Sequence, residues 1–150
     1  MVDIVTPSVR SRMMAGIKGK NSKPEMLVRQ LLFAAGYRFR LHRIDLPGKP
    51  DIVMPGRKVA IFVHGCFWHA HNECKYAKIP SSNPHFWIAK LQANANRDQR
   101  ATEQLVAMGW RVLCVWECAT RNREFVKSLS ERLVDWINSD SQSGEIRSPP

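Results

Sequence analysis

The sequence predicts a single-domain α/β protein, in which a mixed sheet is flanked by helices. Its 150 residues, 44% of them hydrophobic, suffice for one core and are too few for two. Short apolar segments of strand length and segments of helical periodicity follow the order helix, three strands, helix, strand, helix. The strand-helix-strand crossover should be parallel and right-handed, so the ends of the third and fourth strands should lie side by side.

The first helix is expected over residues 24–35. Ser22, Pro24 and Glu25 resemble a helix start, Gly36 is a stop, and apolar residues with helical spacing lie between them: Leu27, Val28, Leu31, Leu32 and Ala35. Because Ser22 and Glu25 fit a capping box, Glu25 is either a helix-start carboxylate or a catalytic one. Spacing alone favours the cap, and only a neighbouring metal site would reverse that preference.

Three strands follow this helix. Residues 37–41 alternate aromatic and basic side chains and predict an edge strand, and a turn rich in Pro and Gly leads into a short strand at 51–54. Asp51 directly follows a proline at the start of that strand, where a carboxylate either satisfies loop amides or faces a divalent ion. The third strand covers residues 58–64.

The second half should contain a long helix from Asn83-Pro84 to Gly109, a strand at 111–118 and a helix marked by apolar positions between 125 and 137. The charged middle of the long helix is interpreted as a solvated face. From residue 138 onward Ser, Asp, Gly and Pro dominate. We therefore expect a folded domain over 24–137 and a disordered tail over 138–150.

The chain is strongly basic, with 23 Lys and Arg against 13 Asp and Glu and a net charge of +10. This charge favours a polyanionic partner, and five Trp and six Phe offer rings that can stack on bases. Charge alone fits a generic basic protein or a membrane-surface binder equally well. Nucleic acid is therefore the first partner to test.

Residues 1–23 form a basic N-terminal arm, because no acidic residue occurs between positions 4 and 24. Two interpretations stay open for the arm. It is either a solvated terminus, or a segment that lies along phosphates through Arg10 and Arg12 and presents Met13 or Met14 as an apolar wedge.

No apolar segment reaches the ~18 residues that a membrane-spanning helix needs, and the first residues lack the basic-then-apolar pattern of a secretory signal. We therefore expect a cytoplasmic protein without a membrane partner. In a reducing cytosol the four cysteines should not form disulfides, so those that cluster favour metal binding.

Residues 60–74 contain a strand that runs into three histidines, two cysteines and an aromatic pair. Cys66, just past the third strand, and Cys118, at the end of the fourth, can converge, and Cys66-x4-His71-x2-Cys74 supplies another thiol and an imidazole. We expect these four side chains to form a closed, structural Zn2+ site that ties the loop to the sheet. Cys114, inside its strand, is interpreted as an unligated buried thiol, which is also the alternative for the other three.

This assignment leaves His64 and His69 without a structural role, while Asp51 lies on the neighbouring strand. A carboxylate for Mg2+, an imidazole that takes a proton from water and a second imidazole form a set suited to phosphodiester hydrolysis. The alternative is that one of the two histidines supports the zinc ligands.

Several motifs together show a family resemblance. They are Pro50-Asp51, Phe62-x-His64-Gly65-Cys66-Phe67-Trp68-His69, His71, Cys74 and Trp116-Glu117-Cys118. Over residues 8–137 the chain resembles the very short patch repair endonucleases, which are bacterial DNA mismatch endonucleases. The resemblance implies a PD-(D/E)xK-type nuclease core in which Phe-x-His replaces the usual lysine motif. It also implies a nick 5′ to the thymine of T:G mismatches that arise by deamination of 5-methylcytosine.

The resemblance implies roles for individual residues. Asp51 and the backbone carbonyl of Val63 would bind Mg2+, and Glu25, His64 and His69 would hold metal-bound waters, with His69 as the general base. The family's zinc ligands correspond to Cys66, His71, Cys74 and Cys118. The aromatic residues Phe67, Trp68 and Trp87, with Met14 from the arm, resemble the wedge that opens the base stack beside the mismatch. These matches turn Glu25 from a capping residue into a catalytic candidate.

The chain departs from the family pattern at two places. Val63 replaces a familiar threonine, which is harmless if only its carbonyl is used, and the loop between His71 and Cys74 is one residue longer. The expected partner is double-stranded DNA with a T:G mismatch, with other mismatch-repair proteins as further candidates. We expect a monomer that associates with the nucleoid when on DNA.

Two other classes of protein stay open. A restriction-type endonuclease on the same core would cut both strands of matched DNA, whereas the aromatic wedge is useful mainly where a base pair is already weak. A non-catalytic, zinc-stabilised DNA-binding module would explain the charge and the cysteines but not Asp51, His64 and His69.

Overall fold

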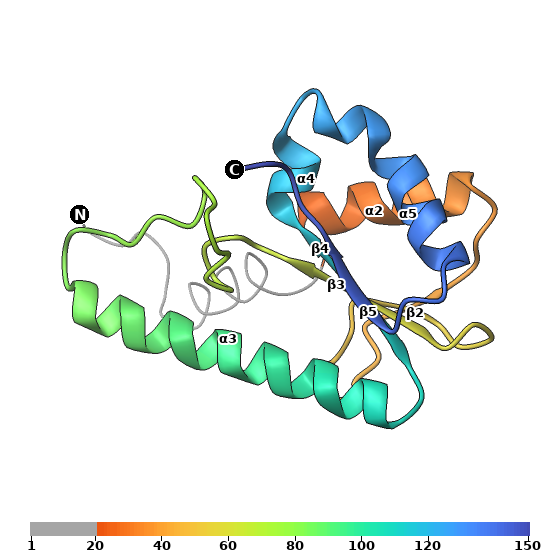
Figure 1. Ribbon diagram of the computed structural model, residues 1–150, viewed down its shortest axis with the longest axis horizontal. Coiled ribbons are helices and arrows are strands. Elements are labelled where there is room, and N and C mark those ends of the chain that lie inside the picture. The colour runs from red at the N-terminus through yellow and green to blue at the C-terminus, as the bar shows by residue number, and fades with distance from the viewer. Residues whose placement is uncertain (1–20) are drawn as a thin grey trace, which may run out of the picture.

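The computed structural model describes residues 21–150, in which a five-stranded mixed sheet of order β1-β2-β3-β4-β5 lies between two layers of helices (Figure 1). The strands are β1 (Arg40–Leu41), β2 (Ile52–Met54), β3 (Val59–His64), β4 (Arg111–Trp116) and β5 (Ser143–Ile146). The helices are α2 (Lys23–Ala34), α3 (Pro84–Ala107), α4 (Glu117–Arg121) and α5 (Leu129–Asn138), with a 3-10 turn η1 at Phe125–Ser128. The predicted α/β class with a mixed sheet is confirmed.

The sheet has a buried core on each face because successive strand residues point to opposite sides. Toward α2 and α5, the strands contribute Ile52, Met54, Val59, Ile61, Leu113 and Val115. Toward α3, the intervening positions contribute Val53, Ala60, Phe62 and Val112, which pack with Leu46 and Leu105. Burial on both faces explains why β3 has an almost uninterrupted apolar sequence.

Strands β3 and β4 are parallel neighbours, as predicted from the crossover through α3. Their register places His64 opposite Trp116, at the last residue of each strand. The segments that follow both strands therefore start at the same edge of the sheet. Strand β2 is antiparallel to β3 and brings its first residues to this same edge, since Ile52 pairs with Ile61.

Helix α2 begins as its sequence predicts. The Ser22 hydroxyl accepts a hydrogen bond from the Glu25 amide at 3.3 Å, and Pro24 occupies the first turn. The chain leaves the helix at Gly36, whose φ of +96° is a left-handed conformation that glycine adopts without strain. The Glu25 side chain in the first turn of α2 is buried and only 1% exposed.

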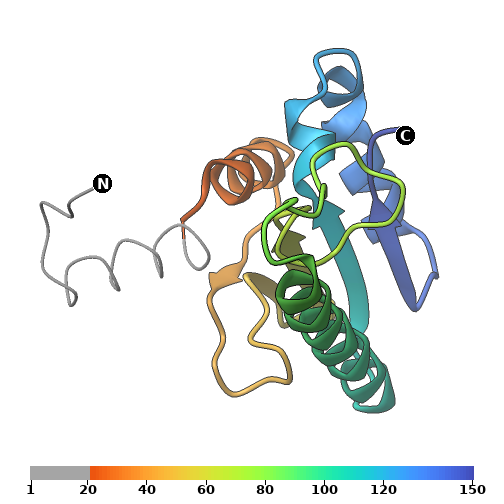
Figure 2. The ribbon, with the colours of Figure 1, turned by 90° about the vertical axis from the view of Figure 1, so that its left-hand side faces the viewer.

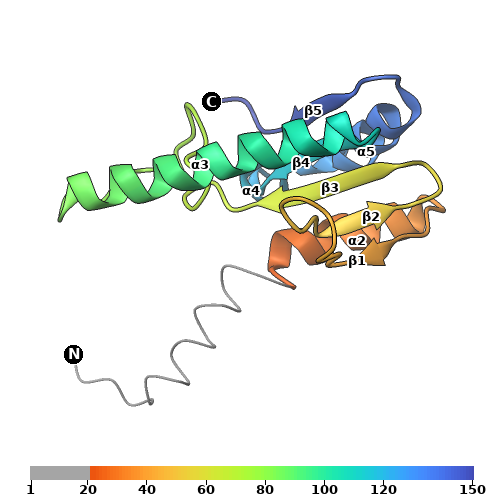
Figure 3. The ribbon, with the colours of Figure 1, turned by 90° about the horizontal axis from the view of Figure 1, so that it is seen from below.

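Helix α3 is 24 residues long, about 36 Å at 1.5 Å per residue, and its first half extends beyond the sheet (Figure 3). Its buried residues are Leu91, Ala101 and Leu105. The predicted start at Pro84 and stop before Gly109 are confirmed. The projecting half carries aromatic side chains away from the core, next to the loop that follows β3.

The tail that was expected to be disordered over 138–150 contains a strand. Ser143–Ile146 forms β5, which pairs in parallel with β4 and buries Ile146. Gly144 must be small, because a Cβ there would lie 2.5 Å from Nε1 of Trp136. The backbone N–H and C=O groups along the outer edge of β4 need hydrogen-bond partners, and β5 supplies them. Composition does not reveal this contribution.

Smaller corrections concern strand and helix ends. The fourth strand stops at Trp116, so Cys118 lies in the short helix α4 rather than in the strand. The first edge strand shrinks from 37–41 to Arg40–Leu41, and the last helix starts at Leu129 after a 3-10 turn. Within residues 21–150, no helix combines the length and the apolar composition that crossing a bilayer requires. The arm residues Arg10, Arg12 and Met14 lie outside the described part of the chain.

Candidate active site and metal-binding cluster

The four predicted zinc ligands meet in one buried cluster. One ligand atom from each of Cys66, His71, Cys74 and Cys118 lies within 4.8 Å of all the others. The loop after β3 supplies three candidate ligands and α4 the fourth, so the cluster joins the segments that follow both parallel strands. Cys118 Sγ lies 3.7 Å from His71 Nδ1, and the Cys118 amide donates to Cys66 Sγ at 3.3 Å.

The chemistry of this cluster fits a Zn2+ ion. All four cysteines of the chain are free thiols, and His71 Nε2 is buried without a hydrogen-bond partner. Burial lowers the pKa of His71 to about 4, so the imidazole is neutral, as a metal ligand must be. Burial, with its thiol neighbours, raises the pKa of Cys66, so its thiolate needs a nearby cation to be favourable.

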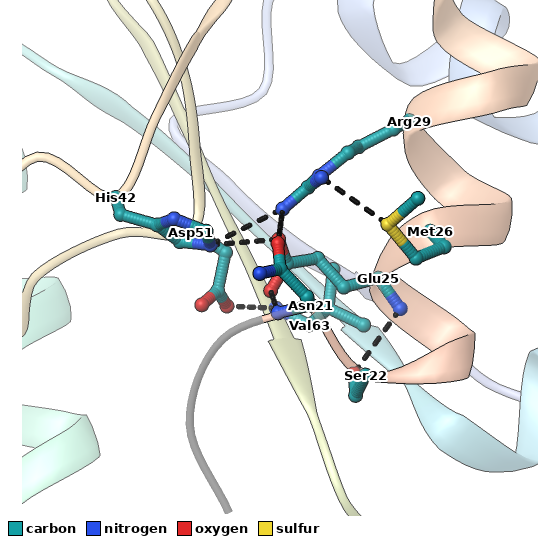
Figure 4. A network of polar contacts seen from close by, with 8 residues as sticks. All are labelled: Asn21, Ser22, Glu25, Met26, Arg29, His42, Asp51 and Val63. Atoms are coloured by element: carbon teal, nitrogen blue, oxygen red, sulfur yellow. Dashed lines mark hydrogen bonds and ion pairs between the residues drawn. The ribbon is translucent and has the colours of Figure 1, made fainter. Parts of the chain in front are cut away.

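A second cluster, drawn in Figure 4, contains two carboxylates and an imidazole. Glu25 of α2, His42 after β1 and Asp51 before β2 place ligand atoms within 4.8 Å of one another. The Val63 amide of β3 donates to Asp51 Oδ2 at 2.8 Å, which fixes the carboxylate against the strand. Direct binding of a cation by Asp51 and by the Val63 carbonyl stays a prediction.

Glu25 has more partners than a helix cap needs. His42 Nε2 lies 2.8 Å from its Oε2, Arg29 forms an ion pair with the same oxygen, and the Asn21 amide donates to Oε1 at 3.3 Å (Figure 4). The helix-start role and the place beside Asp51 are therefore both real. A carboxylate already paired with arginine is better suited to hold water or imidazole than to bind a cation directly.

Burial raises the pKa of Asp51 from its ordinary 3.8 to about 6, although the hydrogen bond from Val63 opposes the change. The nearby Glu25 carboxylate raises it further, while His42 and His69 lower it. His69 therefore lies close enough to influence the charge of Asp51, but burial is the main cause of the raised pKa. Such a carboxylate gains from a cation at this position.

The raised pKa of Asp51 predicts that Asp51→Asn stabilises the protein when no divalent cation is added. The folded state holds the Asp51 proton more tightly than the unfolded chain, so stability falls as pH rises from about 4 to 6. Above pH 6 the ionised carboxylate then costs about 3 kcal/mol, and Asn should recover part of it. Thermal unfolding without added divalent cations, and without a chelator that would remove zinc, should show a Tm several degrees higher for Asp51→Asn than for the unchanged protein at pH 7.5, and a vanishing difference near pH 4.

The exposed Asp135 on α5 provides the control for this measurement, because Asp135→Asn removes the same charge outside the site. A lower Tm for Asp51→Asn than for the unchanged protein at pH 7.5 would contradict the destabilising role of the Asp51 charge.

Two histidines stack at the end of β3. The rings of His64 and His69 lie 3.8 Å apart and are nearly parallel, at 4°. Asp98 of α3 accepts from His69 Nδ1 at 2.5 Å and lies 4.0 Å from His64 Nδ1. Burial and the neighbouring His69 lower the pKa of His64 to about 3, so His64 is neutral at physiological pH. The predicted pair is therefore brought together, with Asp98 as its orienting carboxylate.

These histidines open into a cavity of about 520 Å³ between α3 and the strands β4 and β5. Its wall includes Cys114, whose Sγ lies 3.3 Å from His64 Nδ1 and whose pKa is raised by burial. The interpretation of Cys114 as a thiol outside the zinc cluster is consistent with this position.

The predicted aromatic residues form one group beside the histidines. Ring centroids of Phe67 and Trp68 lie 5.0 Å apart, and Trp87 of α3 lies 5.4 Å from Phe67 and 6.1 Å from Trp68. The Asn94 side chain donates to the Trp68 carbonyl at 2.9 Å, which ties the loop to α3. Phe86, which is half exposed, extends the group at 5.2 Å from Trp87.

Sequence reasoning missed two members of the site. His42 follows a two-residue strand, and its amide bonds the Asp51 carbonyl at 2.9 Å, so a strand pairing brings it to Glu25. Asp98 lies in the charged middle of α3, where the sequence pattern predicts only a solvated face. Its position on the helix that connects the third and fourth strands was the sequence feature that could have indicated a place near the site.

The fold and the site define a class: a basic α/β protein with a cluster of three cysteines and one histidine that could hold a metal ion. Beside it lies a site of carboxylates and histidines suited to metal-assisted phosphodiester hydrolysis. The chain belongs to the Vsr family of DNA mismatch endonucleases. The family model described as DNA mismatch endonuclease Vsr matches residues 2–75. These residues include the carboxylates, both stacked histidines and three of the four candidate zinc ligands.

Curated relatives match nearly the whole chain. The type II nicking enzyme V.XorIIP of Xanthomonas oryzae pv. oryzae is 51% identical over 135 residues, which cover 90% of this chain and 98% of that protein. DNA mismatch endonuclease Vsr of Escherichia coli K12 is 40% identical over 148 residues, or 97% and 94% of the two chains. The type II nicking enzyme V.NmeAIP of Neisseria meningitidis is 42% identical over 134 residues, or 89% and 95%.

Proposed function

We propose that this protein is a Mg2+-dependent DNA mismatch endonuclease that nicks one strand 5′ to the thymine of a T:G mismatch. The observation that supports this most is the convergence of three groups at one edge of the sheet: the Asp51 carboxylate, the His69–Asp98 pair and the aromatic group. A non-catalytic DNA-binding module would need neither the Asp51 carboxylate nor the His69–Asp98 pair. The core would be of the PD-(D/E)xK type, because Asp51 directly precedes β2 and Phe62-x-His64 ends the antiparallel neighbour β3.

The residues of the site divide the reaction between them. Asp51 and the Val63 carbonyl would hold Mg2+, which supplies charge stabilisation at the scissile phosphate. Asp98 accepts from His69 Nδ1 and so leaves Nε2 free to take a proton from the attacking water. His64 stays neutral and stacks on His69, and Glu25 with His42 orders the opposite side of the site.

The zinc cluster has a structural role in this proposal. Cys66, His71, Cys74 and Cys118 would fill all four positions of a tetrahedral ion, which leaves none for a substrate. His69 lies on the same loop between Cys66 and His71. A bound ion would therefore fix the backbone on both sides of the proposed base.

The cellular setting follows from the substrate. We propose that the protein acts as a monomer in the cytoplasm and associates with the nucleoid when it binds DNA. Other mismatch-repair proteins would take over the nicked product.

A nicking assay on T:G and matched duplexes, with and without Mg2+, tests the proposal directly. We expect one-strand cleavage at the T:G site that depends on Mg2+. Cleavage of both strands of matched DNA would instead indicate a restriction-type enzyme, and binding without cleavage would indicate a DNA-binding module.

The aromatic group is predicted to set the preference for T:G. Insertion between base pairs costs a few kcal/mol of stacking, and the cost is smaller where the pair is already weak. Since base–aromatic stacking is worth ~1–3 kcal/mol per base, Phe67→Ala, Trp68→Ala should reduce the ratio of T:G to matched affinity by about tenfold. Neutralising Arg10 and Arg12 should weaken both complexes alike, because phosphate contacts carry no mismatch information.

Affinities at two salt concentrations check this prediction, and Phe33→Ala is a matched control. Phe33 is 57% exposed on α2, away from the aromatic group. An unchanged ratio in the double variant would rule out the wedge as the source of selectivity.

A further inference from the structure

We propose that β5 and Arg147 act as a clamp that holds the segment 71–74 closed around the zinc cluster, with Arg147 as a positioning residue for the metal ligands. The clamp rests on the zinc site proposed above. The C-terminal segment lies beside the loop that follows β3 in two perpendicular views (Figures 1 and 2). Two separate lines of contact join them.

The first line is a pair of hydrogen bonds from one guanidinium. Arg147 Nη1 donates to the Asn72 carbonyl at 2.7 Å, and Nη2 donates to the Glu73 carbonyl at 2.9 Å. Asn72 and Glu73 are the two residues between the candidate ligands His71 and Cys74. The planar fork of arginine can satisfy two adjacent acceptors at once, whereas lysine presents a single point charge.

The loop needs such support because its backbone is strained. Ala70 and Glu73, on either side of His71, have φ of +51° each. Left-handed conformations cost non-glycine residues about 1 kcal/mol or more and persist only where neighbouring contacts enforce them. Without the Arg147 contacts, we expect the backbone next to Cys74 to relax to an unstrained conformation. This change would move Cys74 away from the position that a zinc ligand requires.

The second line reaches His71 through a tryptophan. Glu145 of β5 accepts a hydrogen bond from Trp116 Nε1 at 2.9 Å. The Trp116 ring in turn stacks on the His71 imidazole, 3.8 Å away and tilted by 6°. The orientation of a ligand ring therefore depends on a side chain of β5.

The clamp is anchored to the sheet. β5 pairs with β4 over four residues, from Ser143 to Ile146. Arg111 of β4 adds a side-chain bond to the Ser141 carbonyl at 2.8 Å, and Ile146 is buried. Because the loop is attached to a strand of the sheet, thermal motion should displace the candidate ligands little. A closed metal site needs ligands that are held in place in this way.

Contacts that orient metal ligands typically contribute 10–100-fold to metal affinity. We therefore expect Arg147→Ala to bind Zn2+ at least about tenfold more weakly. Because His69 shares the loop with the ligands, single-turnover nicking should also fall and should recover when Zn2+ is added in excess. A purely structural role in docking β5 would lower the Tm without this recovery.

The test uses the full chain and four variants. Zinc transfer to a chromophoric chelator at 25 °C gives the release rate, competition gives the affinity, and circular dichroism gives the Tm. Arg147→Lys keeps the charge and should still lose most of the effect, and Trp116→Phe, which keeps the stacked ring but loses the N–H, should release zinc a few-fold faster. Arg123→Ala removes a charge at an exposed position and should match the unchanged protein.

The possible results separate the clamp from its alternatives. Equal release rates for the unchanged protein, Arg147→Ala and Arg147→Lys would overturn the clamp while leaving the zinc site intact. Accelerated zinc release by Arg123→Ala would show that loss of positive charge, rather than loss of the Arg147 contacts, weakens zinc binding. A release rate for Arg147→Lys equal to that of the unchanged protein would show that the two hydrogen bonds to the Asn72 and Glu73 carbonyls are not needed. Absence of zinc from the unchanged protein would overturn the zinc assignment and the clamp together. If Arg147→Ala does not fold, the release rates of Arg147→Lys and Trp116→Phe test the clamp in its place.

Discussion

His69→Ala should lower the single-turnover nicking rate at a T:G site by ~10²–10⁴, which is the usual contribution of a general base. The structure gives His69 an orienting carboxylate, since Asp98 accepts from Nδ1 at 2.5 Å, and this leaves one nitrogen for the proton of water. Asp51→Ala should reduce nicking at least as strongly, because it removes the carboxylate that would hold Mg2+. Folding and binding to T:G DNA should be retained in both variants, since the side chains act in the chemical step.

Two further variants sharpen the assignment. Asp98→Asn keeps His69 but removes the carboxylate that orients its ring. The nicking rate of this variant should therefore lie between those of His69→Ala and the unchanged enzyme. Asp135→Asn, in an exposed position on α5, should have no effect. Nicking at a near-normal rate by His69→Ala or Asp51→Ala, in excess enzyme and saturating Mg2+, would remove that residue from its proposed role.

Cys66→Ser and Cys118→Ser should each lose stoichiometric zinc and lower the stability of the fold. Structural Zn2+ sites bind with ~10–16 kcal/mol in small peptides, a value as large as the entire stability of many domains. Even a loss of about 4 kcal/mol would lower the Tm by roughly 8–16 °C in a protein of this size. The effect should be large because the cluster joins the end of β3 to α4 and fixes the loop between them.

Metal analysis of the purified protein, with melting curves before and after addition of a chelator, checks the zinc prediction. Cys114→Ser is the matched control, because its thiol lies beside His64 rather than in the zinc cluster and should not change zinc content. Protein that contains no zinc and melts at the same temperature in chelator would show that the thiols are unligated.

The sequence by itself determined the α/β class and the parallel crossover, and it predicted which central residues of the candidate site the fold brings together. These features follow from local information. Helix α2 is specified by its cap and its glycine stop, β3 by its buried apolar sequence, and the candidate zinc ligands by the density of Cys and His after a strand. The meeting of Cys66 and Cys118, 52 residues apart, could be predicted because parallel strands must end at the same edge.

Only the tertiary structure decided which side chains complete the site. Asp98 and His42 have no distinctive local pattern, and they reach the site because α3 crosses the end of β3 and because β1 pairs with β2. Composition predicted disorder for the segment 143–146, and this prediction was wrong because the strand is stabilised by hydrogen bonds to β4 rather than by its own apolar content. Such contacts arise between residues far apart in the chain, where neither periodicity nor composition carries a signal, and folding alone brings them together.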